Sequence, residues 1–277
     1  MSQTRPNFDL TGPMPGPGVT VLEASAGTGK TYTLAGIVTR LLAEGTCRTG
    51  ALLVVTFTRS ATGELRDRVR GRLLSTYRDL EWSLATGEAP QERLARFLVG
   101  TAGDRAGVHR RWSRLSEALA DFDRATITTT HGFCHMVLAA LGVWGEVAHG
   151  ASLLEAPEDL VREVCDDLYA RWVVMNGPLP FRPGHARTVA GAAIAHPGLE
   201  VLPATGNAQL SDDVLRSRLA SGARKEMDRR LLDANLLTYD ALIYRLAAAL
   251  EHHERGKEAV ARLQERFETV LVDEFQD

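Results

Sequence analysis

Short continuous hydrophobic runs and longer helical stripes follow one another along the chain. The clearest run is residues 51–57, Ala-Leu-Leu-Val-Val-Thr-Phe. It has no polar alternation, which predicts a strand covered on both faces, as in a parallel sheet. Shorter apolar runs predict three further strands at 19–22, 126–129 and 269–272.

Helical spacing of apolar residues fills most of the remaining chain. The first stripe covers 31–42 and is expected to end near Gly45. A second begins at about Ser60, and residues 81–123 predict a charged helical insertion. Further stripes follow at 131–141, from about 156, and at 212–233 and 238–252. Residues 176–211 are rich in Pro and Gly and are expected to form loops.

Strand–helix alternation at both ends of the chain, with a helical middle, predicts an α/β sheet interrupted by a helical subdomain. We expect an extended lead-in at 1–18, a sheet-containing core at 19–136 and 253–277, and a helical accessory subdomain at 137–252.

Composition narrows the possibilities only modestly. The 277 residues are 44% hydrophobic and 24% charged, which is typical of a soluble globular protein. A net charge of −3 gives no global electrostatic argument for nucleic acid, so any such argument must be local. Three widely spaced cysteines suggest neither a disulfide framework nor a metal site, and favour a reducing cytosol. Neither a membrane-spanning run nor a signal peptide is evident.

A glycine-rich turn lies between the first predicted strand and the first predicted helix. Its residues are Ala24, Ser25, Ala26, Gly27, Thr28, Gly29, Lys30 and Thr31. This fits the phosphate-binding P-loop pattern, except that Ala24 replaces the first glycine. Backbone N–H groups of such a turn point at phosphate oxygens. Lys30 should then reach the β- and γ-phosphates, and the Thr31 hydroxyl should bind Mg²⁺.

An acidic pair follows the last predicted strand. Asp273 is placed to hold Mg²⁺, and Glu274 to orient and activate an attacking water. Gln276 could sense the γ-phosphate or that water. Alone, such a pair is often only a surface feature, but the phosphate loop makes an ATP-hydrolysing site the better interpretation.

Taken in order, four motifs resemble those of UvrD/Rep-type superfamily 1 DNA helicases, and among them the RecB subunits. The first is residues 23–31 and the last 273–277. Between them, residues 55–65 and 128–134 resemble two segments that contact single-stranded DNA in that family. The resemblance covers the chain from end to end and implies a RecA-like P-loop sheet, here incomplete. Phe8 resembles part of the family's lead-in, where it would line the base pocket.

The expected DNA contacts are Thr56, Phe57, Thr58, Arg59, Thr130 and His131. Hydroxyls and N–H groups at the ends of parallel strands can bind phosphates without reading the base sequence. Phe57 could stack on a base, or it could belong to the core.

The resemblance implies the N-terminal motor domain of a RecB-like, ATP-dependent helicase of recombinational DNA repair, with subunits of a RecBCD-like complex as partners. Because the family's second RecA-like domain and its arginine fingers would follow residue 277, we expect a truncated fragment that binds nucleotide weakly and unwinds nothing. Two alternatives stay open: a non-catalytic nucleotide-binding remnant or docking module, and a P-loop kinase acting on a small molecule.

Overall fold

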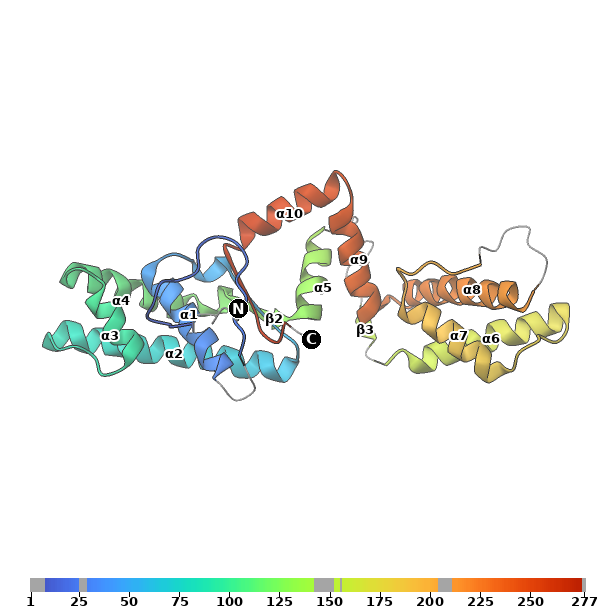
Figure 1. Cartoon of the computed structure of the whole chain (residues 1–277), viewed down its shortest axis with the longest axis horizontal. Helices are drawn as coiled ribbons and strands as arrows, with labels where there is room; N and C mark the ends of the chain where they lie inside the picture. Colours follow the sequence, from blue (N-terminus) through green and yellow to red (C-terminus); the bar gives the residue numbers. More distant parts are fainter. Residues whose placement is uncertain (1–7, 25–28, 142–151, 155, 204–210, 276–277) are drawn as a thin grey trace, which may run out of the picture. The chain divides into compact units, whose positions relative to one another are not determined.

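The computed structural model describes residues 8–24, 29–141, 152–154, 156–203 and 211–275 (Figure 1). Helices dominate these residues, and the strands form two small sheets. The chain divides into two compact units: residues 1–130 with 261–277, which we call the sheet unit, and residues 131–260, which we call the helical unit.

The sheet unit contains α1 (Lys30–Glu44), β1 (Leu52–Thr56), α2 (Arg59–Thr86), α3 (Arg93–Gly100), α4 (Arg105–Ala120), β2 (Thr126–Thr129) and β5 (Thr269–Val272). The helical unit contains most of α5 (Thr130–Leu141), then β3 (Ser152–Leu154), α6 (Glu158–Asn176), α7 (Pro183–Ala195), α8 (Asp212–Asp233), β4 (Leu236–Thr238) and α9 (Tyr239–Glu251). Helix α10 (Arg255–Arg266) runs across the boundary between the units in the sequence.

Three parallel strands form the sheet of the first unit, in the order β2-β1-β5. All five residues of β1 are buried, as the unbroken hydrophobic run predicted. Thr56 pairs with Thr129 of β2, and Val55 pairs with Val272 of β5. The predictions of strands at 51–57, 126–129 and 269–272 are therefore confirmed.

This sheet collects several chain segments at one edge. Because its strands are parallel, their carboxyl ends lie on the same side, where α/β sheets bind ligands. The segments that leave there are Phe57–Thr58 after β1, Thr130 after β2 and Asp273–Glu274 after β5.

The predicted strand at 19–22 is wrong. Val19 is 97% exposed and Val21 is 69% exposed, and neither lies in a strand. An apolar run forms a strand only where neighbouring backbone groups accept its hydrogen bonds. Among the described residues, no strand pairs with this segment.

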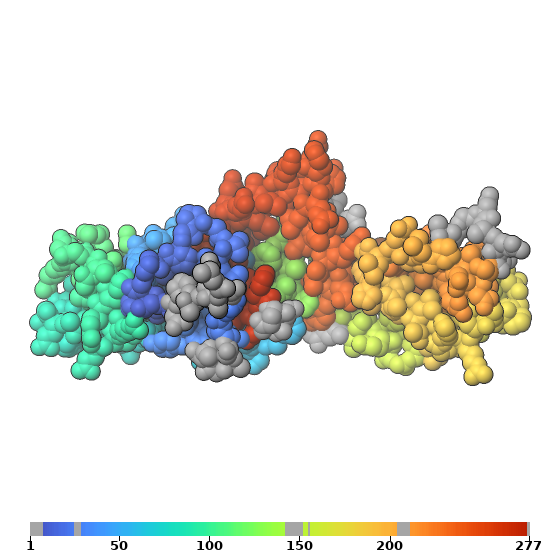
Figure 2. All heavy atoms as spheres, in the orientation of Figure 1, coloured from blue at the N-terminus to red at the C-terminus, as the bar shows by residue number. Residues whose placement is uncertain are grey.

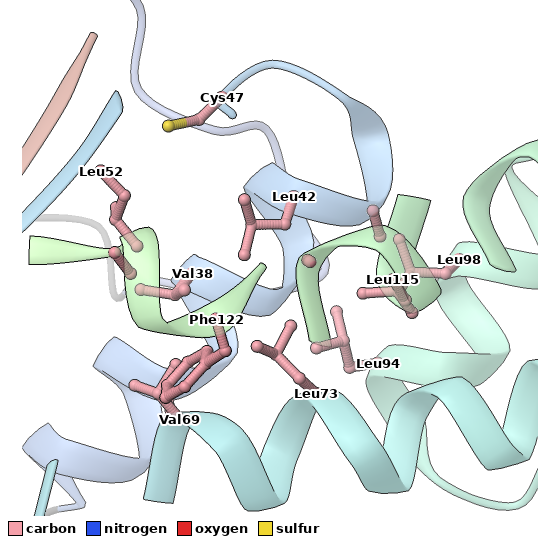
Figure 3. Packing of buried hydrophobic residues seen from close by; sticks show 14 of the residues in the cluster. Val38, Leu42, Cys47, Leu52, Val69, Leu73, Leu94, Leu98, Leu115 and Phe122 are labelled. Atoms are coloured by element: carbon pink, nitrogen blue, oxygen red, sulfur yellow. The ribbon is translucent and has the colours of Figure 1, made fainter. Parts of the chain in front are cut away.

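Helices α1 to α4 share one hydrophobic core with the sheet (Figure 3). Helix α1 ends at Gly45, as predicted, where a φ of 76° requires a left-handed conformation that glycine adopts without steric cost. Leu94 and Leu98 of α3 and Leu115 of α4 are fully buried in the same cluster as Val38 and Leu52. The segment predicted as an insertion therefore contributes directly to the core of the sheet unit.

The helical unit is built on α6, α7 and α8. Val164 and Cys165 of α6 pack with Ala190 of α7 and Met227 of α8. The prediction of loops throughout 176–211 is wrong where α7 forms. Proline indicated a loop there, but Pro183 occupies the first position of the helix, where the missing N–H breaks no hydrogen bond. The parallel pair β3–β4 and helix α10 were also not predicted.

Arginines of α8 link this helix to its neighbours. Arg224 donates to the backbone oxygens of Ala193, His196 and Leu199, and so closes the end of α7. Arg230 donates to Glu226 of its own helix, and to Glu163 and Asp167 of α6. Each of these guanidinium groups satisfies several acceptors at once, which is the geometry that favours arginine over lysine.

Cys47, Cys134 and Cys165 are free and buried. In the part of the chain that the structure describes, no helix is both long enough and apolar enough to cross a membrane.

Leu73 and Leu74 are neighbours on α2 that should differ sharply in their effect on stability. Leu73 is fully buried, whereas Leu74 is 37% exposed. We expect Leu73→Ala to lower the free energy of unfolding by about 2–5 kcal/mol, because it leaves a cavity in the shared core. Leu74→Ala should cost less than about 1 kcal/mol. Urea denaturation followed by fluorescence and circular dichroism measures both, and equal losses would contradict the assigned packing.

The helical unit should lose stability in acid through Glu226. Hydrogen bonds from Arg229 and Arg230 lower the pKa of Glu226 from 4.5 to about 2. Because the folded-state pKa is the lower one, the stabilisation is complete above about pH 4.5 and disappears as the pH falls towards 2. The difference in melting temperature between the wild type and Glu226→Gln should therefore shrink over that range. A difference that does not change with pH would rule out this origin.

Candidate nucleotide-binding site

The start of α1 has the backbone geometry that a phosphate-binding turn requires. Gly29 precedes the helix with a φ of 87°, a left-handed conformation that residues with a Cβ rarely adopt. Its carbonyl oxygen accepts the N–H of Thr33 at 2.9 Å, so Lys30 and Thr31 begin the first turn. Ala24 is exposed, and Ser25, Ala26, Gly27 and Thr28 lie outside the described residues.

Lys30 is held by the acidic motif at the other end of the chain. Its Nζ donates to Oε1 and Oε2 of Glu274, each at 2.8 Å, across 244 residues of sequence. In the space-filling view, red atoms of the last described residues lie against blue atoms of the N-terminal part (Figure 2). The side chains are 28% and 35% exposed, so solvent can reach the pair. The structure thus brings together two of the predicted catalytic residues.

The acidic motif continues directly from β5. The N–H of Asp273 donates to the Val55 oxygen of β1 at 2.8 Å, which fixes this residue at the sheet edge. Glu274 has a φ of 53°, unusual for a residue other than glycine and costing about 1–2 kcal/mol. Its N–H donates to Oδ1 of Asp273 at 3.1 Å. Gln276, a further predicted catalytic residue, lies outside the described residues.

The predicted magnesium ligands come from both chain segments that meet at the ion pair. The described residues contain no cluster of three His, Cys, Asp or Glu side chains able to hold a metal ion. Mg²⁺ commonly uses one or two protein oxygens together with waters and substrate phosphates. Thr31 begins α1 beside Lys30, and Asp273 precedes Glu274, so the ion pair places both predicted ligands on chain segments that meet.

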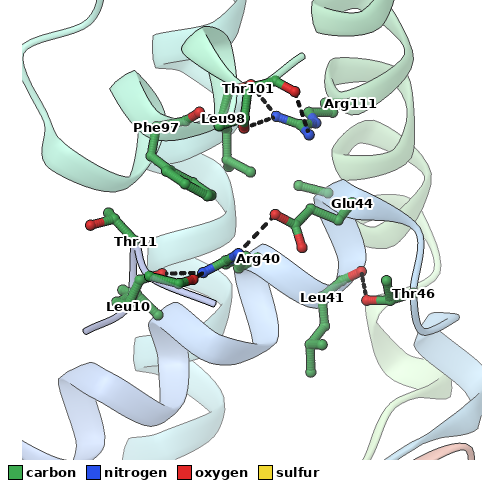
Figure 4. A network of polar contacts seen from close by, with 12 residues as sticks. Leu10, Thr11, Arg40, Leu41, Glu44, Thr46, Phe97, Leu98, Thr101 and Arg111 are labelled. Atoms are coloured by element: carbon green, nitrogen blue, oxygen red, sulfur yellow. Dashed lines mark hydrogen bonds and ion pairs between the residues drawn. The ribbon is translucent and has the colours of Figure 1, made fainter. Parts of the chain in front are cut away.

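The lead-in is anchored along α1 (Figure 4). Arg40 donates to the carbonyl oxygens of Leu10 and Gly12 at 2.7 and 2.6 Å. A Cβ on Gly36 would lie only 2.4 Å from the Leu10 side chain, so glycine permits this close approach. Phe8, the predicted base-pocket residue, is half-buried just before this anchor.

Tyr32 is an aromatic residue of this region that sequence reasoning missed. Its side chain is 54% exposed two residues after Lys30, and the guanidinium of Arg72 lies 4.7 Å from its ring centre. Arg72 is itself only 11% exposed and pairs with Glu92 at 2.7 Å. Arg72 thus supports an aromatic ring beside the predicted phosphate loop. The signal available in the sequence was only an aromatic residue directly after the Lys-Thr pair.

The residues at and after the end of β1 differ in burial and in hydrogen bonding. Thr56 is buried, with its hydroxyl 2.6 Å from that of Thr62, so its burial does not support the expected DNA contact. The Thr58 hydroxyl caps α2 by accepting the N–H of Ala61 at 3.1 Å. By contrast, Phe57 is 51% exposed and not a core residue. Arg59 follows as an exposed residue at the start of α2.

The other predicted DNA contacts begin α5. Thr130 is exposed directly after β2. His131 is half-buried, and burial lowers the pKa of its imidazole below the usual value, an effect that the carboxylate of Asp240 opposes. Burial thus favours the neutral imidazole, which has one hydrogen-bond donor and one acceptor.

Comparison with known proteins decides the family. Residues 13–277 match the model for the UvrD/REP helicase N-terminal domain. The chain belongs to the UvrD/REP helicase family. It is 41% identical over 275 residues to the RecBCD enzyme subunit RecB of Mycolicibacterium smegmatis, covering 98% of this chain and 24% of that protein.

Two further RecB relatives agree with this assignment. RecB of Mycobacterium tuberculosis strain CDC 1551 is 41% identical over 274 residues, or 98% of this chain and 24% of the relative. RecB of Escherichia coli K12 is 34% identical over 167 residues, or 57% of this chain and 13% of the relative. The chain thus spans about a quarter of the length of its mycobacterial relatives, and the matched residues include the UvrD/REP helicase N-terminal domain.

The ion pair predicts an effect of Glu274 on nucleotide affinity. Glu274→Gln removes the carboxylate that, in the structure, competes with phosphate oxygens for the Lys30 ammonium. We expect ATP without added metal to bind about two- to fivefold more tightly, the range that a solvent-accessible ion pair provides. Equilibrium titration with a fluorescent ATP analogue measures this.

Glu268→Gln is the matched control, because it removes an acidic partner of Arg48 just before β5. It should leave the affinity unchanged. Weaker binding by Glu274→Gln would show that the carboxylate does not compete with nucleotide.

Proposed function

We propose that this chain is the ATP-binding motor segment of a RecB-like, ATP-dependent DNA helicase that acts in recombinational DNA repair. The observation that carries the proposal is the 2.8 Å contact between Lys30 and Glu274. It joins the phosphate loop and the acidic motif at the carboxyl edge of a parallel sheet, where nucleotide-binding α/β proteins place their ligands.

ATP would bind at the start of α1 with its phosphates on the Lys30 ammonium. Thr31 and Asp273 would hold Mg²⁺, which neutralises charge on the phosphate oxygens when bound. Phe8 would line the base pocket, and the exposed ring of Tyr32 offers a surface on which a base could stack.

Lys30 and Glu274 must exchange partners before hydrolysis. In the structure, each neutralises the other. When Lys30 moves to the phosphates, Glu274 becomes a carboxylate able to orient a water and accept its proton. Gln276 would respond to the γ-phosphate. Closure against a second RecA-like domain would convert this exchange into movement along a strand.

Single-stranded DNA would cross the same edge of the sheet. The exposed Phe57 can stack on a base, and Arg59 and Thr130 can attract or bind phosphates. Residues 137–252 would serve as the helical accessory subdomain. Other subunits of a RecBCD-like complex would be partners, and a reducing cytoplasm would suit three buried, free cysteines.

Nucleotide binding by Lys30→Ala tests the proposal. The wild-type chain should bind ATP with Mg²⁺, and the variant should bind at least about tenfold more weakly, since one charge-assisted contact to phosphate is worth roughly 1.5–3 kcal/mol. Isothermal titration calorimetry with the purified chain measures this. Lys225→Ala, which removes an exposed lysine of α8, is the matched control and should bind like the wild type.

Equal affinity for ATP in the wild type and Lys30→Ala would contradict a motor site and favour a docking module. Nucleotide consumption that responds to a small metabolite but not to single-stranded DNA would favour a P-loop kinase.

A further inference from the structure

His131 has an aromatic partner that lies 108 residues further along the chain. The rings of His131 and Tyr239 are 4.4 Å apart between centres and inclined at 62°. This edge-to-face arrangement is a preferred geometry for aromatic side chains. Both residues belong to the helical unit, where α9 runs beside α5 (Figure 1).

Tyr239 is a firmly placed residue. It begins α9 directly after β4, whose Thr238 pairs with Leu154 of β3. The Thr238 hydroxyl caps the helix by accepting the N–H of Ala241 at 3.2 Å. One turn further on, Leu242 is fully buried. The tyrosine ring is therefore held by the sheet pairing, the cap and the packing of its helix.

The imidazole of His131 needs such a neighbour if it is to make a directional contact. A neutral imidazole has one N–H donor and one acceptor, so the orientation of its ring decides which atom faces a ligand. The start of α9 brings two groups to this imidazole: the ring of Tyr239 and the carboxylate of Asp240.

We propose that Tyr239 is a positioning residue for His131, and that its ring fixes the imidazole so that the imidazole N–H can donate to a backbone phosphate of single-stranded DNA. This inference rests on the proposed function, because His131 directly follows Thr130, which that function places against the DNA backbone. It adds a residue from outside the motifs that suggested DNA contact. Tyr239 itself does not need to touch the DNA.

Two measurements on the complete 277-residue chain test the inference. The first is the titration of the His131 ring by NMR. In Tyr239→Ala, the ring should gain access to water, and its pKa should rise towards 6.5, the ordinary value. Tyr239→Phe keeps the ring and should leave the pKa unchanged.

The second measurement is the affinity for fluorescein-labelled oligo(dT), followed by anisotropy at fixed salt. We expect His131→Ala and Tyr239→Ala each to weaken binding by about three- to tenfold, and the double variant to be no weaker than either single variant. Tyr239→Phe should bind like the wild type. Tyr244→Ala, which removes an exposed tyrosine of the same helix, is the matched control and should bind normally.

The outcomes separate this inference from the proposed function. If the wild type binds oligo(dT), and Tyr239→Ala has the affinity and His131 pKa of the wild type, the positioning role is wrong. It is also wrong if the losses of the two single variants multiply in the double variant. If the wild type binds ATP but no oligo(dT), His131 has no role in DNA binding. The inference about Tyr239 is then wrong as well, whereas the proposed ATP site stands. Should Tyr239→Ala not fold, Tyr239→Leu replaces it, with the same expected losses.

Discussion

The contact between Lys30 and Glu274 is the interaction on which the functional architecture depends. A primary amine at the start of α1 and a carboxylate after β5 meet at 2.8 Å, although 244 residues separate them in sequence. Such a meeting requires β5 to pair with β1 in the observed register, because the N–H of Asp273 is fixed to the oxygen of Val55. It also requires α1 to begin sharply at Gly29, where only a residue without a side chain reaches a φ of 87° easily. The ion pair therefore depends both on the pairing of β5 with β1 and on the position at which α1 begins.

Parallel pairing of the strands explains why predicted functional residues from distant motifs lie at the same edge of the sheet. Each strand of the β2-β1-β5 sheet delivers the residues that follow it to the same side. Hydrogen bonding then distinguishes those residues. The Thr56 and Thr58 hydroxyls make hydrogen bonds within the start of α2, whereas the Phe57 ring stays half exposed between them. These hydroxyls, which were predicted to bind phosphates, support the turn that presents the ring. A motif cannot reveal this role, because it lists residue types without their hydrogen-bond partners.

The sequence correctly predicted those helices and strands whose formation depends on residues close together in the chain. The unbroken apolar run of β1, the glycine that ends α1 and the stripe of α8 all appear where the sequence placed them. Prediction failed where the outcome depends on a distant partner. Val19 and Val21 have the pattern of a strand, but no described strand pairs with them. The same limit applies to the site. Spacing in the sequence pointed to Lys30 and Glu274, which the structure brings into contact. The contacts of Tyr32 with Arg72 and of His131 with Tyr239 join residues that share no motif.

The shared core of α1 to α4 bears on how this family can be engineered. Residues 81–123 look detachable in the sequence, because they are charged and bounded by helix breaks. In the folded chain, however, Leu94, Leu98 and Leu115 fill the same interior as the central strand. A chimaera that exchanged this segment for a relative's would have to exchange the facing surfaces of α1 and α2 as well, since close-packed interiors tolerate little change in volume. The natural crossover points for recombining such motors therefore lie outside this whole four-helix layer.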